Sequence, residues 1–387
     1  MRGICPRITS VTGLALLLSA MLGGCSGGGG SSTTTSIPPS GLAPGAPAAP
    51  APMTTSLPIP SSVAEFAVPS TMQGGAGLTL GPDGNIWFTA AGLVGYIVPS
   101  WVPSHPVPEL TVTPAAAQGI VPGQGQTLWF YSATPGAFSG QVLTYLVQIS
   151  TSGTVLRTIP DFSGTQPNKC QNVSVLEPGS GATVLVGWSI AVVPEGPFAV
   201  NTVVQQINAA GNLVQLASIQ GLISDLAQGP RSIWSTWMYY NFGTGLAPSG
   251  ALPPAIAEIT PTGQVNAITV PSGYTPGGIT VCACGTPYVA LNTVNANNGA
   301  IGRVNTDGSV TLFPVPSSIG GITTGGDGAI WFTEPATNQI GRLLSSGTIT
   351  QYAIPTSNAG PNRIVAGPNN TMWFTEISAN KIGRITY

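Results

Sequence analysis

A short string recurs along this chain, in which a glycine-rich turn leads into an aromatic strand. Its clearest copies are "GPDGNIWFT" (81–89), "GGDGAIWFT" (325–333) and "GPNNTMWFT" (367–375). Four weaker copies occupy residues 123–131, 179–187, 229–237 and 283–291. The shorter intervals between copies are 42 or 43 residues, which matches the length of one four-stranded propeller blade, about 40–45 residues. The chain is therefore predicted to be all-β and to form a seven-bladed β-propeller of four-stranded blades.

Each clear copy lies among four strand signals. Around the copy at 325–333, alternating apolar residues predict strands over 320–325, 329–334, 339–344 and 348–355. An Asp-Gly turn separates the first two, and Asp-Gly tolerates the positive φ angles of a tight hairpin. The longer intervals elsewhere in the chain leave room for loop insertions between such strands.

The last copy is incomplete. It begins at Asn362, ends with the chain at Tyr387, and has three strand signals where the others have four. The missing fourth-strand pattern occurs alone before the first copy, as "SVAEFAVPST" (62–71). We therefore expect this segment to pair with the final strand, "NKIGRITY" (380–387), and to close the ring, because closure protects sheet edges that would otherwise stay open.

The Trp-Phe pair in the second strand of each clear copy is predicted to pack between blades. Successive side chains of a strand point to opposite sides, so each pair would place one ring against each neighbouring blade; a sugar-stacking surface is the alternative. Composition agrees with a packed β protein, since 42% of residues are hydrophobic and 6% are charged. The formal net charge of −2 argues against nucleic-acid binding through phosphate contacts.

The first residues resemble a secretory signal. After a positively charged start, residues 12–22 are apolar but too short to span a membrane, and "LGGC" (22–25) follows. This pattern is typical of a bacterial lipobox, in which Cys25 becomes the lipidated first residue once a signal peptide, residues 1–24, is removed. Cleavage near Ala20, with Cys25 uninvolved, is the alternative.

Residues 25–60 are rich in Gly and Ser and then in Pro and Ala, and we expect them to tether a propeller at 61–387 to its anchor. These features predict a lipid-anchored protein of the bacterial cell envelope, on the periplasmic or cell-surface side. The membrane would be a partner through Cys25, and the propeller is expected to be a monomer. No second apolar run is long enough to predict a membrane-spanning helix.

Three cysteines remain once Cys5 and Cys25 are set aside, so at most one intramolecular disulfide forms among Cys170, Cys282 and Cys284. Two of them stand in "VCACG", which the pattern places on a strand. In an extended strand their Cα atoms would lie near the upper limit for a disulfide. Plain buried cysteines are therefore favoured over a disulfide or a fragment of a metal site.

The strings "GPDGNIWFT", "IWFTEPATNQIGRLL" and "MWFTEISANKIGRITY" resemble the repeat of the streptogramin B lyase (virginiamycin B lyase) family. The resemblance covers roughly residues 62–387 and implies the same seven-bladed fold. It also implies a lyase that linearises a cyclic depsipeptide antibiotic. Members of the family use histidines at the starts of inner strands, a nearby glutamate and a magnesium ion.

This chain departs from the family at those histidines. The seventh unit starts with "PNRI" (361–364), and neither the fifth nor the sixth unit has a histidine at the matching place. The glutamate position is kept as Glu334 and Glu376. The lone histidine, His105, is predicted to lie between the third and fourth strands of the first unit, on the opposite face. The general base of the lyase reaction is thus missing where the family keeps it.

The candidate ligand-binding residues belong to the face of the ring at which first strands begin. They are Asn362, Arg363, Glu376, Glu334, Asn292 and Tyr274. Two insertions, at 189–201 and 238–254, are predicted to follow second strands and to border the same face, and such loops usually carry the binding function of a propeller. The aromatic residues of these insertions are Phe198, Tyr239, Tyr240 and Phe242.

The sequence favours a binding or interaction module for a peptide, a glycan or a protein. One alternative is a carbon–oxygen lyase like the streptogramin B lyases, assisted by Mg²⁺, with Glu376, Glu334 and Arg363 as weak catalytic candidates. A second is a lactonase-like hydrolase, which would need several carboxylates or amides around a metal. No ligand spacing predicts a metal site, and no cofactor is expected outside the lyase alternative.

Overall fold

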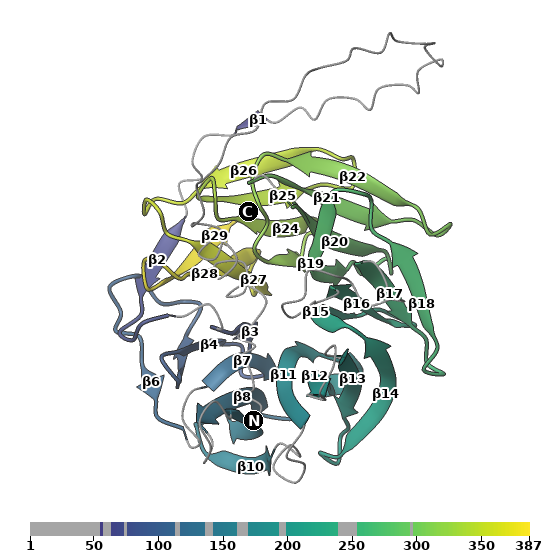
Figure 1. The fold of residues 1–387 in the computed structure, drawn as a ribbon. Helices are drawn as coiled ribbons and strands as arrows, with labels where there is room; N and C mark the ends of the chain where they lie inside the picture. Colours follow the sequence, from purple (N-terminus) through teal and green to yellow (C-terminus); the bar gives the residue numbers. More distant parts are fainter. Residues whose placement is uncertain are drawn as a thin grey trace, which may run out of the picture.

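Seven sheets stand around a central axis in the part of the chain that the computed structural model describes (Figure 1). The structure describes residues 55–56, 63–72, 76–112, 117–135, 142–160, 169–192, 199–238, 254–294 and 297–387. The first strand of each blade is innermost, and it packs against the innermost strands of the two neighbouring blades. The predicted seven-bladed β-propeller is confirmed.

The strands of each blade follow one another outward from the axis. Blade 1 contains β3 (Leu78–Leu80), β4 (Ile86–Ala90), β5 (Leu93–Ile97) and β6 (Glu109–Leu110). Blade 2 contains β7 (Ala117–Pro122), β8 (Thr127–Pro135), β9 (Val142–Ser150) and β10 (Val155–Pro160). Blade 3 contains β11 (Lys169–Pro178), the short 3-10 helix η2 (Ser180–Ala182), β12 (Val184–Val192), β13 (Ala199–Ile207) and β14 (Leu213–Gln220).

The later blades follow the same order, except that blade 7 takes its fourth strand from elsewhere. Blade 4 contains β15 (Leu222–Gln228), β16 (Ile233–Met238), β17 (Ala255–Ile259) and β18 (Val265–Thr269). Blade 5 contains β19 (Tyr274–Val281), β20 (Pro287–Thr293), β21 (Gly299–Val304) and β22 (Val310–Val315). Blade 6 contains β23 (Ile322–Thr324), β24 (Ile330–Glu334), β25 (Gln339–Leu343) and β26 (Ile349–Ala353). Blade 7 begins with β27 (Pro361–Gly367), β28 (Thr371–Glu376) and β29 (Lys381–Thr386).

This order defines two faces of the ring. We call the face at which first strands begin and second strands end the top face. The bottom face carries the turns between first and second strands and between third and fourth strands. Adjacent strands within a blade pair antiparallel, as β4 does with β3 and β5, so successive connections alternate between the two faces.

The fourth strand of blade 7 comes from the other end of the chain. β2 (Ala64–Ala67) pairs antiparallel with β29, and Phe66 lies opposite Ile382. The carboxylate of Glu65 accepts a hydrogen bond from Thr356 N at 2.9 Å and lies 2.8 Å from Lys381 Nζ. The predicted closure of the ring is confirmed, and β29 is not an open edge.

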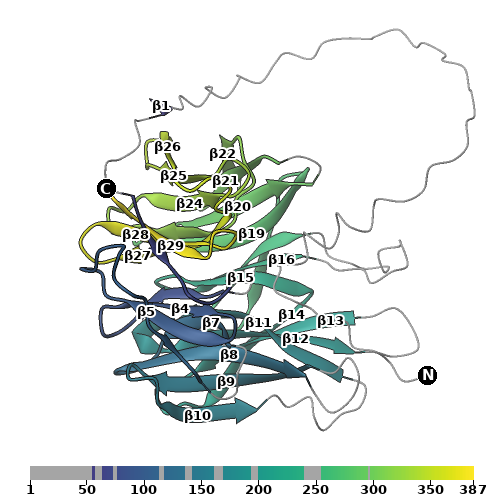
Figure 2. The same ribbon diagram turned by 90° about the vertical axis from the view of Figure 1, so that its left-hand side faces the viewer.

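A further strand lies at the outer edge of blade 6. β1 (Thr55–Ser56) pairs parallel with β26, with Thr55 opposite Thr350. Figures 1 and 2 show β1 apart from β2, outside the ring. β1 therefore extends blade 6 and takes no part in closure.

The Trp-Phe pairs pack between blades, as the repeat predicted. Trp87 packs against residues of blade 2, whereas Phe88 packs against blade 7. Trp331 and Phe332 divide in the same way between blades 7 and 5. All four rings are fully buried. The tryptophan of each pair faces the following blade and the phenylalanine faces the preceding one, because adjacent side chains of a strand point to opposite sides.

The turn before each of these strands also fixes the indole ring. Trp87 Nε1 donates a hydrogen bond to Asp83 at 3.0 Å, and Trp331 Nε1 donates to Asp327 at 3.2 Å. Both aspartates belong to the tight turn between the first and second strands of their blades. The repeated turn therefore reverses the chain and also supplies an aspartate that accepts a hydrogen bond from the buried indole N–H. Leaving that N–H without a partner would cost stability.

The turn between β19 and β20 corrects the expectation for two cysteines. Free buried cysteines were favoured, but Cys282 and Cys284 form a disulfide with their Cα atoms 5.2 Å apart. The segment is a turn and not an extended strand, since Gly285 N donates to Cys282 O at 2.8 Å and Gly285 has a φ of +87°. The turn shortens the Cα separation into the ordinary range for a disulfide.

Replacing Phe66 with alanine is expected to cost about 3–5 kcal/mol of unfolding free energy. Its side chain is fully buried, and its ring centroid lies 5.4 Å from that of Trp373. Urea unfolding measures the effect. Leu156→Ala, at a residue that is 53% exposed on β10, is the control and should change stability by less than about 0.5 kcal/mol. Equal stabilities of the two variants would contradict a role for β2 in holding the ring together.

Candidate functional site

The six candidate residues lie at the top face, but they do not form one cluster. They begin or end strands there: Tyr274 in β19, Asn292 in β20, Glu334 in β24, Asn362 and Arg363 in β27, and Glu376 in β28. Among the described residues, no hydrogen bond or ion pair joins any two of these six side chains. Each must therefore be considered with its own neighbours, and their role as ligand-binding residues stays a prediction.

Two asparagines at this face take part in hydrogen bonds that connect neighbouring blades. Asn292 Nδ2 donates to Ile319 O at 3.0 Å, and its Oδ1 accepts from Ile319 N at 2.7 Å. The backbone oxygen of Asn362 accepts a hydrogen bond from Thr333 Oγ1 at 2.7 Å. The same hydroxyl accepts from Gly321 N at 2.8 Å. These contacts connect blade 5 to the loop that leads into blade 6, and blade 6 to blade 7.

Glu334 lies inside blade 6 and does not reach the surface. Its side chain is fully buried, and its carboxylate accepts hydrogen bonds from Gln351 Nε2 at 2.9 and 2.7 Å and from Thr337 Oγ1 at 3.1 Å. Loss of hydration raises the pKa of Glu334, while these two donors oppose the rise. Glu334 is thus held by partners within its own blade.

Glu376 occupies the matching position in blade 7 without the matching partner. It is fully buried, and in the described part of the chain neither carboxylate oxygen has a hydrogen-bond partner. β26 supplies Gln351 to Glu334, whereas β2 carries Glu65 at the equivalent register. Burial raises the pKa of Glu376 to about 8, the negative charge of Glu65 adds to the rise, and Lys381 opposes it.

Side chains from three blades converge near the axis of the ring. Arg363 of β27 reaches Glu177 of β11, with Nη1 and Oε1 3.3 Å apart. Blades 7 and 3 are not neighbours, and their innermost strands β27 and β11 lie on different sides of the central axis (Figure 1), so this ion pair joins two separate parts of the ring. Asp225 of β15 interacts with both. Glu177, Asp225 and Arg363 are referred to below as the channel cluster.

The carboxyl groups of Glu177 and Asp225 lie close enough for the ionisation of each to affect the other. Enclosure by the surrounding strands raises the pKa of Glu177, the negative charge of Asp225 adds to the rise, and Arg363 opposes it. Burial also raises the pKa of Asp225, but Arg363 and two backbone donors, Ile279 N at 2.9 Å and Leu226 N at 3.0 Å, favour its charged form. Arg363 therefore favours the charged form of both carboxyl groups and opposes the effect of their burial.

The channel cluster remains in contact with solvent. Arg363 keeps 47% of its side-chain surface accessible and Glu177 keeps 23%. Tyr131 of β8 lies close by, and burial raises the pKa of its hydroxyl while Arg363 opposes the rise. A guanidinium and two carboxyl groups at one place can bind a polar or charged group through hydrogen bonds.

Sequence reasoning identified Arg363 but missed Glu177 and Asp225. Both acids lie in blades whose copies of the repeat string are weak, so no alignment of repeats points to them. A usable signal was present, because innermost strands are otherwise mostly apolar or small. Asp225 is the one charged residue of β15, and Glu177 is the one acid of β11.

The remaining sequence candidates lie away from the channel cluster. His105 lies between β5 and β6 on the bottom face, as predicted, where its ring stacks on Trp101 with centroids 3.8 Å apart. The loop aromatics Phe198, Tyr239, Tyr240 and Phe242 lie outside the described residues. In the described ranges, no group of three His, Cys, Asp or Glu side chains is arranged to hold a metal ion.

The closed ring is that of a seven-bladed β-propeller with a charged cluster near its axis. Residues 252–387 match the virginiamycin B lyase family. A curated virginiamycin B lyase from Nocardia farcinica (strain IFM 10152) is 37% identical over 96 residues. The matched stretch covers 24% of this chain and spans 33% of that relative.

Solved structures share the whole ring. Virginiamycin B lyase from Staphylococcus aureus superposes with a TM-score of 0.60 at 21% identity, over 84% of this chain and 99% of that one. A streptogramin B lyase structure gives a TM-score of 0.60 at 23% identity, over 84% and 96%. YCF48 bound to D1 peptide gives 0.55 at 10% identity, over 86% and 98%. At these identities the likeness shows a common fold.

Replacing Glu376 with glutamine is expected to remove a pH-dependent loss of stability. The pKa of this carboxyl is about 8 in the folded protein and 4.5 as an unperturbed side chain. Between these values the folded state binds the extra proton, so wild-type stability falls as the pH rises through this window. The free energy of unfolding of the neutral variant should therefore rise relative to that of the wild type by up to about 1.4 kcal/mol per pH unit.

Urea unfolding at several pH values between these two limits measures this difference. Below the lower value the carboxyl is protonated in both states, so the relative stability of the two proteins should be constant there. A constant difference across the whole range would mean that Glu376 is ionised in the folded protein.

Proposed function

We propose that this propeller is a binding module whose ligand is held at the channel from the top face. The observation that supports it is the accessible guanidinium of Arg363, which lies 3.3 Å from a carboxyl group of a distant blade near the axis of the ring. Arg363 offers hydrogen-bond donors, and the carboxyl groups of Glu177 and Asp225 offer acceptors. This combination suits the backbone carbonyls, carboxylates and amides of a peptide or protein segment, and a glycan is the other ligand class that we consider.

The chemistry of the relatives supports binding over the lyase alternative. A histidine-to-alanine variant of the Staphylococcus aureus lyase, studied with quinupristin, is catalytically inactive. The one histidine of this chain stacks on Trp101 at the bottom face. The lyase alternative would need Glu376 or Glu334 as its base, and both side chains are fully buried. YCF48, which shares the fold, is bound to a peptide.

We further propose that a lipid anchor at Cys25, followed by the tether at 25–60, holds the propeller in a bacterial cell envelope as a monomer. Apart from β1, these residues lie outside the described part of the chain. The Cys282–Cys284 disulfide agrees with an oxidising compartment. No helix in the described ranges combines the length and apolar character needed to cross a membrane.

Replacing Arg363 with glutamine is expected to weaken ligand binding about tenfold or more, because a charge-assisted hydrogen bond is lost. The measurement is binding of fluorescent peptides from a random library to the purified propeller, by anisotropy. Arg303→Gln, which removes an arginine of β21, is the control and should bind like the wild type.

The same proteins separate the alternatives. Unchanged peptide affinity in Arg363→Gln would contradict the proposed site. Linearisation of a streptogramin B antibiotic by the wild type in the presence of Mg²⁺, followed by chromatography, would favour the lyase alternative. The double variant Arg363→Gln/Glu177→Gln checks that any loss does not come from an unpaired acid.

A further inference from the structure

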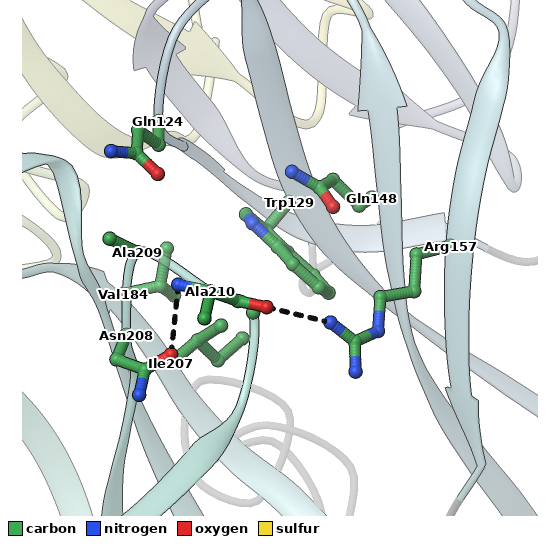
Figure 3. A pocket seen from close by; sticks show the side chains of 10 residues that line it. Gln124, Trp129, Gln148, Arg157, Val184, Ile207, Asn208, Ala209 and Ala210 are labelled. Atoms are coloured by element: carbon green, nitrogen blue, oxygen red, sulfur yellow. Dashed lines mark hydrogen bonds between the residues drawn. The ribbon is translucent and has the colours of Figure 1, made fainter.

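A small pocket lies on the bottom face, away from the channel cluster. It encloses 130 Å³ between blades 2 and 3 (Figure 3). The turn after β7, strands β9 and β10, and the turn between β13 and β14 surround it. The side chains that matter for its chemistry are Gln124, Trp129, Gln148, Arg157 and Asn208.

The indole N–H of Trp129 lacks the partner that blades 1, 6 and 7 provide. In blades 1 and 6 the corresponding indole donates to an aspartate of the preceding turn, and in blade 7 it donates to Thr371, the first residue of β28. Trp129 is 2% exposed and lines the pocket, and none of the hydrogen bonds within the described residues involves its Nε1. Gly125 stands where blade 1 has Asp83. An N–H donor beside a cavity is thus available to a ligand.

Arg157 brings an unpaired positive charge to the same pocket. Its Nη1 donates to Ala210 O at 3.4 Å, and it forms none of the salt bridges found among the described residues. The guanidinium packs on Gly211, where the first carbon of any side chain would collide with it. Most of its donors are therefore free, and the turn of blade 3 is shaped to leave it room.

Amide groups complete the lining. Gln148 Nε2 donates to Thr127 Oγ1 at 3.2 Å, so its oxygen remains available, and Gln124 lies on the other side of the indole ring (Figure 3). No carboxylate lines the pocket. The site thus combines one cation, several N–H donors and amide oxygens, but no acid that could pair with a cationic ligand.

We propose that this pocket binds the carboxylate-bearing ring of a hexuronic acid, either free or at the end of a glycan. Arginine matches a carboxylate with paired hydrogen bonds, and the amides suit the hydroxyl groups of a sugar ring. Its volume is well below the roughly 300–1,000 Å³ of sites that enclose a drug-sized ligand, so it holds one ring and not a whole oligosaccharide. An amino acid fits less well, because its ammonium group would face Arg157 without a carboxylate partner.

Calorimetric titration with D-glucuronate tests the proposal, with glucose as the uncharged counterpart. The wild type should bind glucuronate and not glucose, and the affinity should fall with added salt. Arg157→Gln should weaken glucuronate binding about tenfold or more, whereas Arg363→Gln, which affects the proposed channel site, should not change it. Equal binding of glucose and glucuronate, or unchanged affinity in Arg157→Gln, would overturn the proposal, as would the absence of binding at the solubility limit.

The indole N–H resonances give a second readout that locates the ligand. The chain has eight tryptophans, and glucuronate should shift one indole signal, the one missing from Trp129→Phe. If that variant does not fold, loss of the shift in Arg157→Gln serves the same purpose. Methyl glucuronoside mimics the end of a glycan. It should bind as tightly as free glucuronate if the ligand is a glycan terminus. It should bind more weakly than free glucuronate if the ligand is the free acid. Shifts in several indoles or in none would contradict binding at this pocket.

Discussion

The pairing of β2 with β29 is the contact on which the ring depends. Every blade buries one face against each of two neighbours, so an open ring would leave two apolar faces in water. Phe66 fills the interface between blades 7 and 1, and the guanidinium of Arg384 lies 5.4 Å from the ring centroids of both Phe66 and Trp373. A four-residue strand therefore joins seven similar units into one closed core.

Closure also changes the electrostatics of the blade that it completes. The closing strand comes from a different part of the chain, so it carries Glu65 where blade 6 carries Gln351. Glu65 turns to Lys381 and Thr356 and holds the end of blade 6, which leaves Glu376 without a donor. Two glutamates at equivalent positions in the repeat thus differ in their hydrogen-bond partners because of one residue on a neighbouring strand.

Both candidate sites lie where the repeat is least regular. Blades 3 and 4 carry weak copies of the string, and their inner strands place Glu177 and Asp225 at the axis. Blade 2 has Gly125 in place of the turn aspartate, which leaves the N–H of Trp129 facing a pocket. The regular positions build the ring, so departures from the repeat are where side chains become available for binding.

The sequence by itself determined the blade number, the closing strand and the sides to which Trp331 and Phe332 point, because these follow from periodicity and local turns. It misjudged Cys282 and Cys284, since a strand and a turn of the same residues differ in Cα spacing. The tertiary structure alone decided that Arg363 meets Glu177, 186 residues away. That meeting depends on the closure of the whole ring and on side-chain directions across its axis, which no local pattern encodes.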